Sequence, residues 1–191
     1  MESIKGTQTE RNLLKAFAGE SQARNRYDYF AGAARKEGYQ QIASIFEETA
    51  LQERMHAKRF FSFLEGGEVE ITAGFPAGVV GSLAENLRAA AAGENMEWTA
   101  LYPGFAAVAR EEGFTSVARL FDAVCVAEKQ HEKRYLDLLR NVELGQVFKR
   151  DSESVWRCIK CGYLHSGKEA PGLCICCAHP QGWFELLGEN W

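Results

Sequence analysis

This 191-residue chain has no long apolar run and no excess of basic residues, and its first residues lack signal-peptide features. No apolar run reaches the roughly 18 residues that a membrane-spanning helix requires. The formal net charge is −4 and no basic patch is present, so nucleic acids and anionic membranes are not expected as partners. Residues 1–5 do not resemble the start of a signal peptide, and we therefore expect a cytoplasmic location.

Cysteine is almost absent before Cys158, and five of the six cysteines lie from that position onwards. Without a secretion signal, reduced thiolates are expected rather than disulfides. Cys158-x-x-Cys161 and Cys174-x-x-Cys177 form two knuckles separated by twelve residues. This spacing is typical of a tetrahedral four-sulfur site, which binds either iron or zinc.

The other residues near the knuckles are given different roles. Gly162 follows the first knuckle and allows the tight turn that directs backbone N–H groups at sulfur. Cys176 is not spaced as a knuckle ligand, and we exclude it from the site. Cys125 lies in an apolar run and is expected in the core. His179 is close enough in sequence to support the second knuckle.

A Glu-x-x-His pair occurs twice in the chain, and each pair has a further Glu upstream at a nearly equal spacing. The full set is Glu20, Glu53, His56, Glu94, Glu128 and His131. On a helix, the Glu and His of one pair share a face, with Cβ atoms roughly 5–6 Å apart. Together the set predicts a cage for two metal ions inside a four-helix bundle. Carboxylates and imidazoles suit iron or manganese better than calcium or copper.

An internal repeat of two helical hairpins occupies most of the chain. We expect helices over residues 8–36, 39–65, 82–111 and 114–144. Residues 66–81 are long enough to travel the length of the bundle, and one long crossover predicts a ferritin-like topology.

The repeat is not quite regular in its spacing. The step along the chain from Tyr27 to Tyr102 is one residue longer than the step from Glu20 to Glu94. One extra residue inside a helix is usually accommodated as a π-bulge, which we predict within residues 95–102.

The repeat also breaks chemically at one position. Glu97 lies three residues after Glu94, where the first copy has Ala23. Glu97 is either a solvated surface residue or a further ligand that competes with His56 for one metal ion. Tyr27 and Tyr102 lie about two turns from Glu20 and Glu94. They are either ordinary core aromatics or hydrogen-bond donors to the ligating carboxylates.

These motifs together resemble the rubrerythrin family over essentially the whole chain. The resemblance implies a mainly α, ferritin-like four-helix bundle with one long crossover over residues 1–147. It further implies a linker over 148–153 and a small rubredoxin-like domain over 154–191. One departure is Ile175, where the family's second knuckle usually has proline after its first cysteine.

The resemblance also implies a function and a set of site residues. It implies a non-haem diiron peroxidase that reduces hydrogen peroxide to water in oxidative-stress defence. Rubredoxin and a pyridine-nucleotide-dependent reductase are the implied electron donors, and a homodimer is the implied assembly. The implied diiron ligands are Glu20, Glu53, His56, Glu94, Glu97, Glu128 and His131. Cys158, Cys161, Cys174 and Cys177 are the implied ligands of one further iron, and Glu97, His56, Tyr27 and Tyr102 are the implied catalytic groups.

Two other functions use the same residues. A ferroxidase or iron-handling protein would use the bundle site with dioxygen in place of peroxide. A structural protein would combine a metal-stabilised bundle with a zinc ribbon. The visible absorption of ferric four-sulfur iron, which zinc lacks, distinguishes iron from zinc at the cysteine site.

Overall fold

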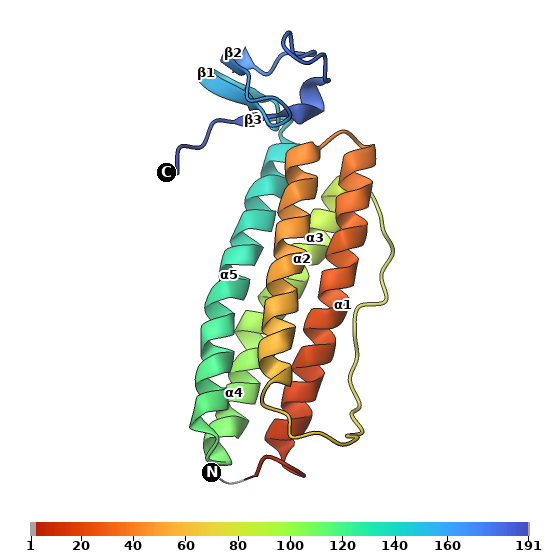
Figure 1. The fold of residues 1–191 in the computed structure, drawn as a ribbon, viewed down its shortest axis with the longest axis vertical. Coiled ribbons are helices and arrows are strands. Elements are labelled where there is room, and N and C mark those ends of the chain that lie inside the picture. The colour runs from red at the N-terminus through yellow and green to blue at the C-terminus, as the bar shows by residue number, and fades with distance from the viewer. Residues whose placement is uncertain (1–2, 191) are drawn as a thin grey trace.

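The computed structural model describes residues 3–190, and within them the chain forms a helical bundle capped by a small sheet (Figure 1). The helices are α1 (Gln8–Lys36), α2 (Gln40–Phe61), α3 (Leu83–Met96), α4 (Tyr102–Glu111) and α5 (Thr115–Glu143). A π-helical turn, η1 (Glu97–Leu101), joins α3 to α4, so the three segments serve as the third long helix. The four predicted helices are confirmed, although α2 ends at Phe61, before its expected end at residue 65.

The helices begin and end where local chemistry directs them. Ser82 and Glu85 form a capping box at the start of α3. At the start of α1, the Thr7 hydroxyl accepts a hydrogen bond from the Glu10 N–H. The Glu10 carboxylate in turn accepts one from the Gly6 N–H. Gly38, with a φ of 88°, follows α1 in the left-handed conformation that glycine adopts without strain.

The connection between α2 and α3 is the predicted long crossover. It runs beside the outer face of α1 from one end of the bundle towards the other (Figure 1). Among the described residues it contains neither helix nor strand. The bundle therefore has the ferritin-like topology rather than an up-down-up-down one.

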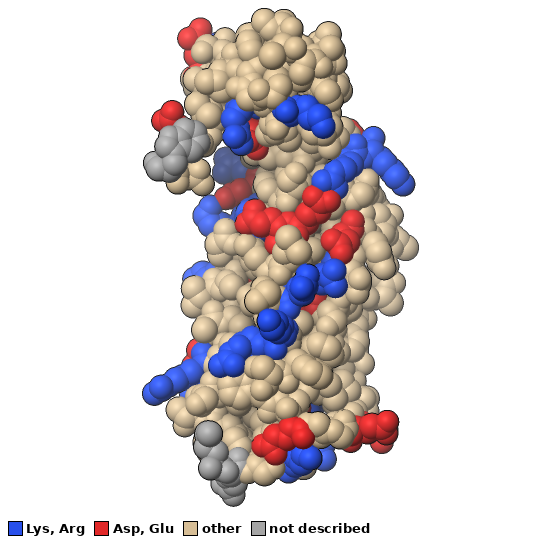
Figure 2. Space-filling view, in the orientation of Figure 1, with Lys and Arg blue, Asp and Glu red and all other residues tan. Residues whose placement is uncertain are grey.

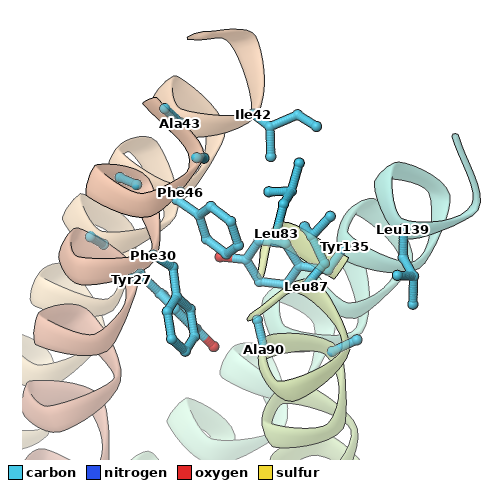
Figure 3. Close-up of a cluster of buried hydrophobic side chains, with 14 of the residues drawn as sticks. Tyr27, Phe30, Ile42, Ala43, Phe46, Leu83, Leu87, Ala90, Tyr135 and Leu139 are labelled. Carbon is cyan, nitrogen blue, oxygen red and sulfur yellow. The ribbon is translucent and has the colours of Figure 1, made fainter. Parts of the chain in front are cut away.

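Two apolar clusters fill the bundle and leave its middle for polar residues. The first cluster contains Tyr27, Phe46 and Tyr135, whose rings pack between the helix pairs (Figure 3). The second is built around Phe60 and Phe121, with ring centroids 5.1 Å apart. Burying one such side chain stabilises the fold by about 1.5–3 kcal/mol. This apolar burial offsets the cost of the charged groups that lie between the clusters.

The C-terminal residues form a three-stranded antiparallel sheet in the order β2-β1-β3. Its strands are β1 (Lys149–Cys158), β2 (Leu164–Glu169) and β3 (Phe184–Leu186), and a 3₁₀ turn, η2 (Gln181–Trp183), precedes β3. The sheet packs around the fully buried Trp156. Residues 149–153 were expected to belong to a linker, but they begin β1, with an irregular register before Ser154.

The small sheet domain docks on the end of the bundle at the turn between α1 and α2. The Tyr39 and Phe148 rings stack with centroids 5.6 Å apart. A Cβ on Gly182 would lie 1.9 Å from the Gly38 carbonyl oxygen, so only glycine permits this approach.

Charges of both signs lie side by side on the face of the bundle drawn in Figure 2. Two surface ion pairs occupy equivalent places in the repeat: Arg35 with Glu47, and Arg110 with Asp122. Each pair ties the two helices of one hairpin together, although exposed pairs contribute at most about 1 kcal/mol. None of the described helices is long and apolar enough to span a membrane.

Candidate metal centres

The duplicated Glu and His residues meet in the middle of the bundle as two overlapping groups. Glu20, Glu53, His56 and Glu128 form the first group, and Glu53, Glu94, Glu128 and His131 form the second. Within each group the potential ligand atoms lie within 4.8 Å of one another. Glu53 and Glu128 belong to both groups, which is the arrangement expected of carboxylates that bridge two metal ions.

The distances around the two imidazoles repeat this two-fold pattern. His56 Nδ1 lies 2.9 Å from Glu53 Oε2 and 2.9 Å from Glu128 Oε1. His131 Nδ1 lies 3.1 Å from the opposite Glu53 oxygen and 2.8 Å from the opposite Glu128 oxygen. Each shared carboxylate thus turns one oxygen towards each imidazole.

The polar atoms at this centre lack the hydrogen bonds that burial requires. Several of them are buried and, despite the nearby imidazole and carboxylate atoms, make no hydrogen bond of regular geometry within the described chain: Glu20 Oε2, Glu53 Oε1, Glu94 Oε2, both Glu128 carboxylate oxygens and His131 Nδ1. Leaving such atoms unpaired is costly, and most proteins avoid it. Two divalent cations would bind all of these donors and balance the four carboxylates. The residues therefore fit a pair of metal ions.

The ionisation of the metal-free groups points the same way. Burial, and then the charge of Glu53, raises the pKa of both Glu20 and Glu94 well above the usual range. Burial alone would lower the pKa of His131, but Glu128, Glu53 and Glu94 raise it to about 11. The neighbouring carboxylates outweigh burial in the same way to raise the pKa of His56. Without metal, protons on the imidazoles thus supply the positive charge that balances the carboxylates, and metal binding must displace these protons.

The two tyrosines bind the site carboxylates across the repeat. The Tyr27 hydroxyl donates to Glu94 Oε1, and the Tyr102 hydroxyl donates to Glu20 Oε1. The expected tyrosine–carboxylate hydrogen bonds are confirmed, with each tyrosine reaching the Glu of the other half. The second oxygen of each Glu is one of the buried unpartnered atoms, so the tyrosines orient these carboxylates towards the metal site.

Glu97 lies beside the cluster without belonging to either group of ligand atoms. It is the first residue of the π-helical turn, which confirms the predicted bulge, and it is 7% exposed. Burial, and next the charges of Glu20 and Glu94, raises its pKa well above the usual range. Glu97 is therefore a buried neighbour of the cluster rather than a solvated surface residue. Its role as a ligand stays a prediction.

One residue of the site has no signal in the sequence. Gln52 Oε1 lies 2.9 Å from His131 Nε2, on the side of the ring that faces away from the cluster. This contact favours the tautomer with its proton on Nε2, which leaves Nδ1 free for metal. Because Gln52 is on α2 and His131 is on α5, no periodicity within either helix could reveal the pair.

The four predicted knuckle cysteines gather at one end of the small domain. Cys158, Cys161, Cys174 and Cys177 form a single potential ligand group, and the sulfur atoms of Cys158 and Cys177 are 3.8 Å apart. Burial works against ionisation of the Cys174 thiol, but nearby backbone N–H groups lower its pKa to about 7. Four thiols around one point fit a tetrahedral metal ion.

The two knuckles have the same turn but different residues in it. The Gly162 N–H donates to the Cys158 carbonyl, and the Ala178 N–H donates to the Cys174 carbonyl, both at 2.8 Å. Gly162 has a φ of 80° and Ala178 has a φ of 55°, which is the only positive φ of a non-glycine residue in the described chain.

The remaining candidates near the knuckles lie outside the ligand group. Cys176 is exposed, and Cys125 packs, partly buried, at the edge of the second apolar cluster. His179 Nδ1 is 3.0 Å from the Cys177 carbonyl oxygen, and its ring packs against Trp183. His179 thus supports the backbone of the second knuckle.

The fold and the two centres define the class of protein: a ferritin-like bundle with a diiron-type carboxylate–histidine site, followed by a four-cysteine rubredoxin-like domain. Family models agree along the chain. The rubrerythrin model matches residues 11–139, and the model of the rubrerythrin rubredoxin-like domain matches residues 156–185. The chain belongs to the rubrerythrin family. Its sites are accordingly a diiron centre and a rubredoxin-like iron site.

Individual relatives extend over nearly the same length. The chain is 62% identical to a rubrerythrin of Porphyromonas gingivalis, over 99% of this chain and 94% of that protein. It is 59% identical to a rubrerythrin of Nitratidesulfovibrio vulgaris, over 100% of both chains. The fully reduced, all-ferrous structure of nigerythrin superimposes with a TM-score of 0.63 at 32% identity, covering 97% of this chain and 92% of that one.

Proposed function

We propose that this protein is a peroxidase that reduces hydrogen peroxide to water, with electrons delivered through the four-cysteine iron, in oxidative-stress defence. Membership of the rubrerythrin family, whose members are generally oxidoreductases, supports this proposal. The observation that carries it is the buried Glu97, a fifth carboxylate present beside the cluster in one half of the repeat only.

The proposed ligands follow from the two groups of donor atoms. Glu20, Glu53, His56, Glu94, Glu128 and His131 would hold two iron ions, and the four knuckle cysteines would hold a third. When bound, two ferrous ions would supply the two electrons that, together with two protons taken from water, convert hydrogen peroxide into two water molecules.

Glu97 and His56 are the proposed alternative ligands of one of the two metal ions. Glu20 is the carboxylate with the largest electrostatic effect on Glu97, and it shares a ligand group with His56. We infer that, with iron bound, Glu97 and His56 would be alternative ligands at this position. An anionic carboxylate favours ferric iron, and a neutral imidazole favours ferrous iron. The hydrogen bonds from Tyr27 and Tyr102 would keep Glu94 and Glu20 oriented towards the metal site in either case.

Electron delivery favours a dimer. The small domain docks near Tyr39, and His56 lies more than four helical turns further along α2, or roughly 25 Å at about 1.5 Å per residue. Electron transfer slows steeply with distance, so we propose that the four-cysteine iron of one subunit serves the diiron site of another in a homodimer. Mixed dimers with Cys158→Ser in one protomer and Glu53→Ala in the other should retain turnover if transfer crosses the interface.

The electron donors are proposed from the family resemblance. We propose rubredoxin and a pyridine-nucleotide-dependent reductase, acting in the cytoplasm. Reduction of the four-cysteine iron by each candidate donor, followed by its visible absorption, tests this assignment.

Replacement of Glu97 tests the proposed function directly. Glu97→Ala should retain iron and slow the oxidation of the reduced protein by hydrogen peroxide about 10–100-fold, as loss of a metal-site group typically does. Stopped-flow absorbance measures the rate. Glu111→Ala, at an exposed position on α4, is the matched control and should react at the wild-type rate.

Two results would contradict this proposal. Unchanged kinetics in Glu97→Ala would contradict the role of Glu97 as an alternative ligand. Faster oxidation of the wild-type protein by dioxygen than by peroxide would favour a ferroxidase.

A further inference from the structure

A cavity of about 270 Å³ lies between α1, the crossover and the π-helical turn. Most of its wall is apolar, including Phe75 from the crossover and Phe105 from α4. Its buried end is formed by Tyr27 and Glu97, which are 1% and 7% exposed. Partly exposed polar residues, among them Arg26, line its outer part. The cavity therefore leads from the surface to the edge of the diiron site.

Glu97 lines this cavity, and the two tyrosine hydroxyls of the site donate to other carboxylates, those of Glu94 and Glu20. The four other carboxylates of the centre, those of Glu20, Glu53, Glu94 and Glu128, are at most 1% exposed. Glu97 is thus the carboxylate through which a small polar molecule in the cavity would first meet the site.

Two glycines keep the cavity open. Gly19 and Gly93 precede Glu20 and Glu94 at equivalent places in the repeat, and each lies inside a helix, where glycine costs about 1 kcal/mol relative to alanine. A Cβ on Gly93 would meet nothing within 4 Å, and one on Gly19 would meet only Phe75 Cε1, at 3.9 Å. Close backbone packing does not require either glycine, so the space left by their missing side chains is the feature that accounts for both.

Phe75 lies where it can restrict this space. It belongs to the crossover, is 43% exposed and is the nearest side chain above Gly19. We propose that the cavity is the route by which hydrogen peroxide reaches the diiron site, and that Phe75 limits the route to molecules of that size. This inference rests on the proposed peroxidase function.

Filling the cavity tests the route. Gly93→Leu should slow oxidation of the reduced protein by hydrogen peroxide about tenfold or more, because the side chain takes up the space that the substrate crosses. Gly93→Ala, which adds a single methyl group at the same position, should slow the reaction less than Gly93→Leu does. Equal rates for all three proteins would overturn the route. A wild-type protein that peroxide does not oxidise would instead contradict the proposed function itself.

Enlarging the cavity tests the size limit. Phe75→Ala should increase the rate with tert-butyl hydroperoxide about tenfold and change the rate with hydrogen peroxide little. Val79→Ala, at an 86% exposed crossover position that is not part of the cavity lining, should change neither rate. Unchanged selectivity in Phe75→Ala would show that Phe75 does not limit access.

A measurement that does not depend on iron provides a second test. The thiol of Gly93→Cys should react with methyl methanethiosulfonate and resist N-phenylmaleimide, unless Phe75→Ala is also present. Peptide mapping by mass spectrometry separates this thiol from Cys125 and Cys176. A thiol that the small reagent cannot reach, or that both reagents reach equally in the presence of Phe75, would overturn the proposal.

Discussion

The two halves of the bundle follow one plan, and the main difference between them is a single turn. They share the two helices, the Glu-x-x-His pair, the tyrosine and the ion pair that closes each hairpin. The first half continues as a regular α-helix past Ala23, whereas the second places Glu97 at the matching position and begins a π-helical turn there. The comparison teaches that the shared plan builds the metal cage, and that the one irregular turn supplies the chemical asymmetry.

The largest expected effect comes from the shared carboxylates. Glu53→Ala and Glu128→Ala change equivalent residues that belong to both ligand groups, so each should abolish binding of both metal ions in the bundle. Metal analysis should show iron only at the four-cysteine site, whose visible absorption should remain. Glu20→Ala, which affects one group, is the control. Retention of two bundle irons in either variant would contradict the bridging role.

The second-largest expected effect is a pH-dependent difference in stability between the metal-free and the metal-loaded protein. His131 has an ordinary pKa of 6.5 and a raised pKa of about 11 in the metal-free fold. Because the pKa is higher in the folded than in the unfolded protein, protonated His131 stabilises the fold fully below pH 6.5. This stabilisation is lost as the pH rises towards 11, by about 1.4 kcal/mol per pH unit for each proton. The raised pKa values of Glu20 and Glu94 act in the same direction.

Metal binding releases these protons, so the difference in stability between loaded and metal-free protein should grow with pH. Chemical unfolding of both forms between pH 6.5 and about 9 measures it. A metal-free protein that becomes more stable over this range would contradict the assignment of protons to the two imidazoles.

A smaller effect is expected from the hydrogen bond that His131 Nε2 donates to Gln52 Oε1. Gln52 contacts His131, and the equivalent position in the second half is Ala127. Gln52→Ala should lower metal affinity about 10–100-fold, since the ring loses the partner that fixes its tautomer. Competition with a chelator measures the affinity. Gln130→Ala, on the exposed face of α5, provides a control that should leave it unchanged.

The smallest effect concerns the two cysteine knuckles, which, like the two halves of the bundle, share one structure and differ at a particular residue. Ala178 adopts the left-handed backbone conformation that Gly162 adopts in the first knuckle. Ala178→Gly should stabilise the small domain by about 1 kcal/mol, because the left-handed conformation costs alanine about that much. Thermal unfolding followed at the four-cysteine iron absorption tests this, and a loss of stability would contradict it.

The sequence predicted which side chains share a helix face and the cage that they form, but it missed several contacts between distant segments. The spacing of Glu53 and His56 predicted a shared face, and the offset between the repeats predicted the π-helical turn. The contact of Gln52 with His131, the exchange of tyrosine partners between the halves, and the approach of Gly182 to Gly38 all join distant segments. Periodicity reports the direction of a side chain and not the residue that it meets.

The start of β1 was missed for a related reason. Residues 149–153 are polar and were assigned to the linker, but they continue a strand whose pairing resumes after an irregular register. The domain boundaries therefore stay predictions.

The exchange of tyrosine partners also bears on how such a bundle arose. Tyr27 and Tyr102 each complete the site of the opposite half, so neither hairpin could orient its own carboxylate alone. Two identical hairpins that associated around a two-fold axis would satisfy the same pair of bonds. Fusion of their genes would then raise the effective concentration of one hairpin near the other, with the crossover as tether. Only after fusion could one copy acquire a carboxylate and an extra residue that its twin never received.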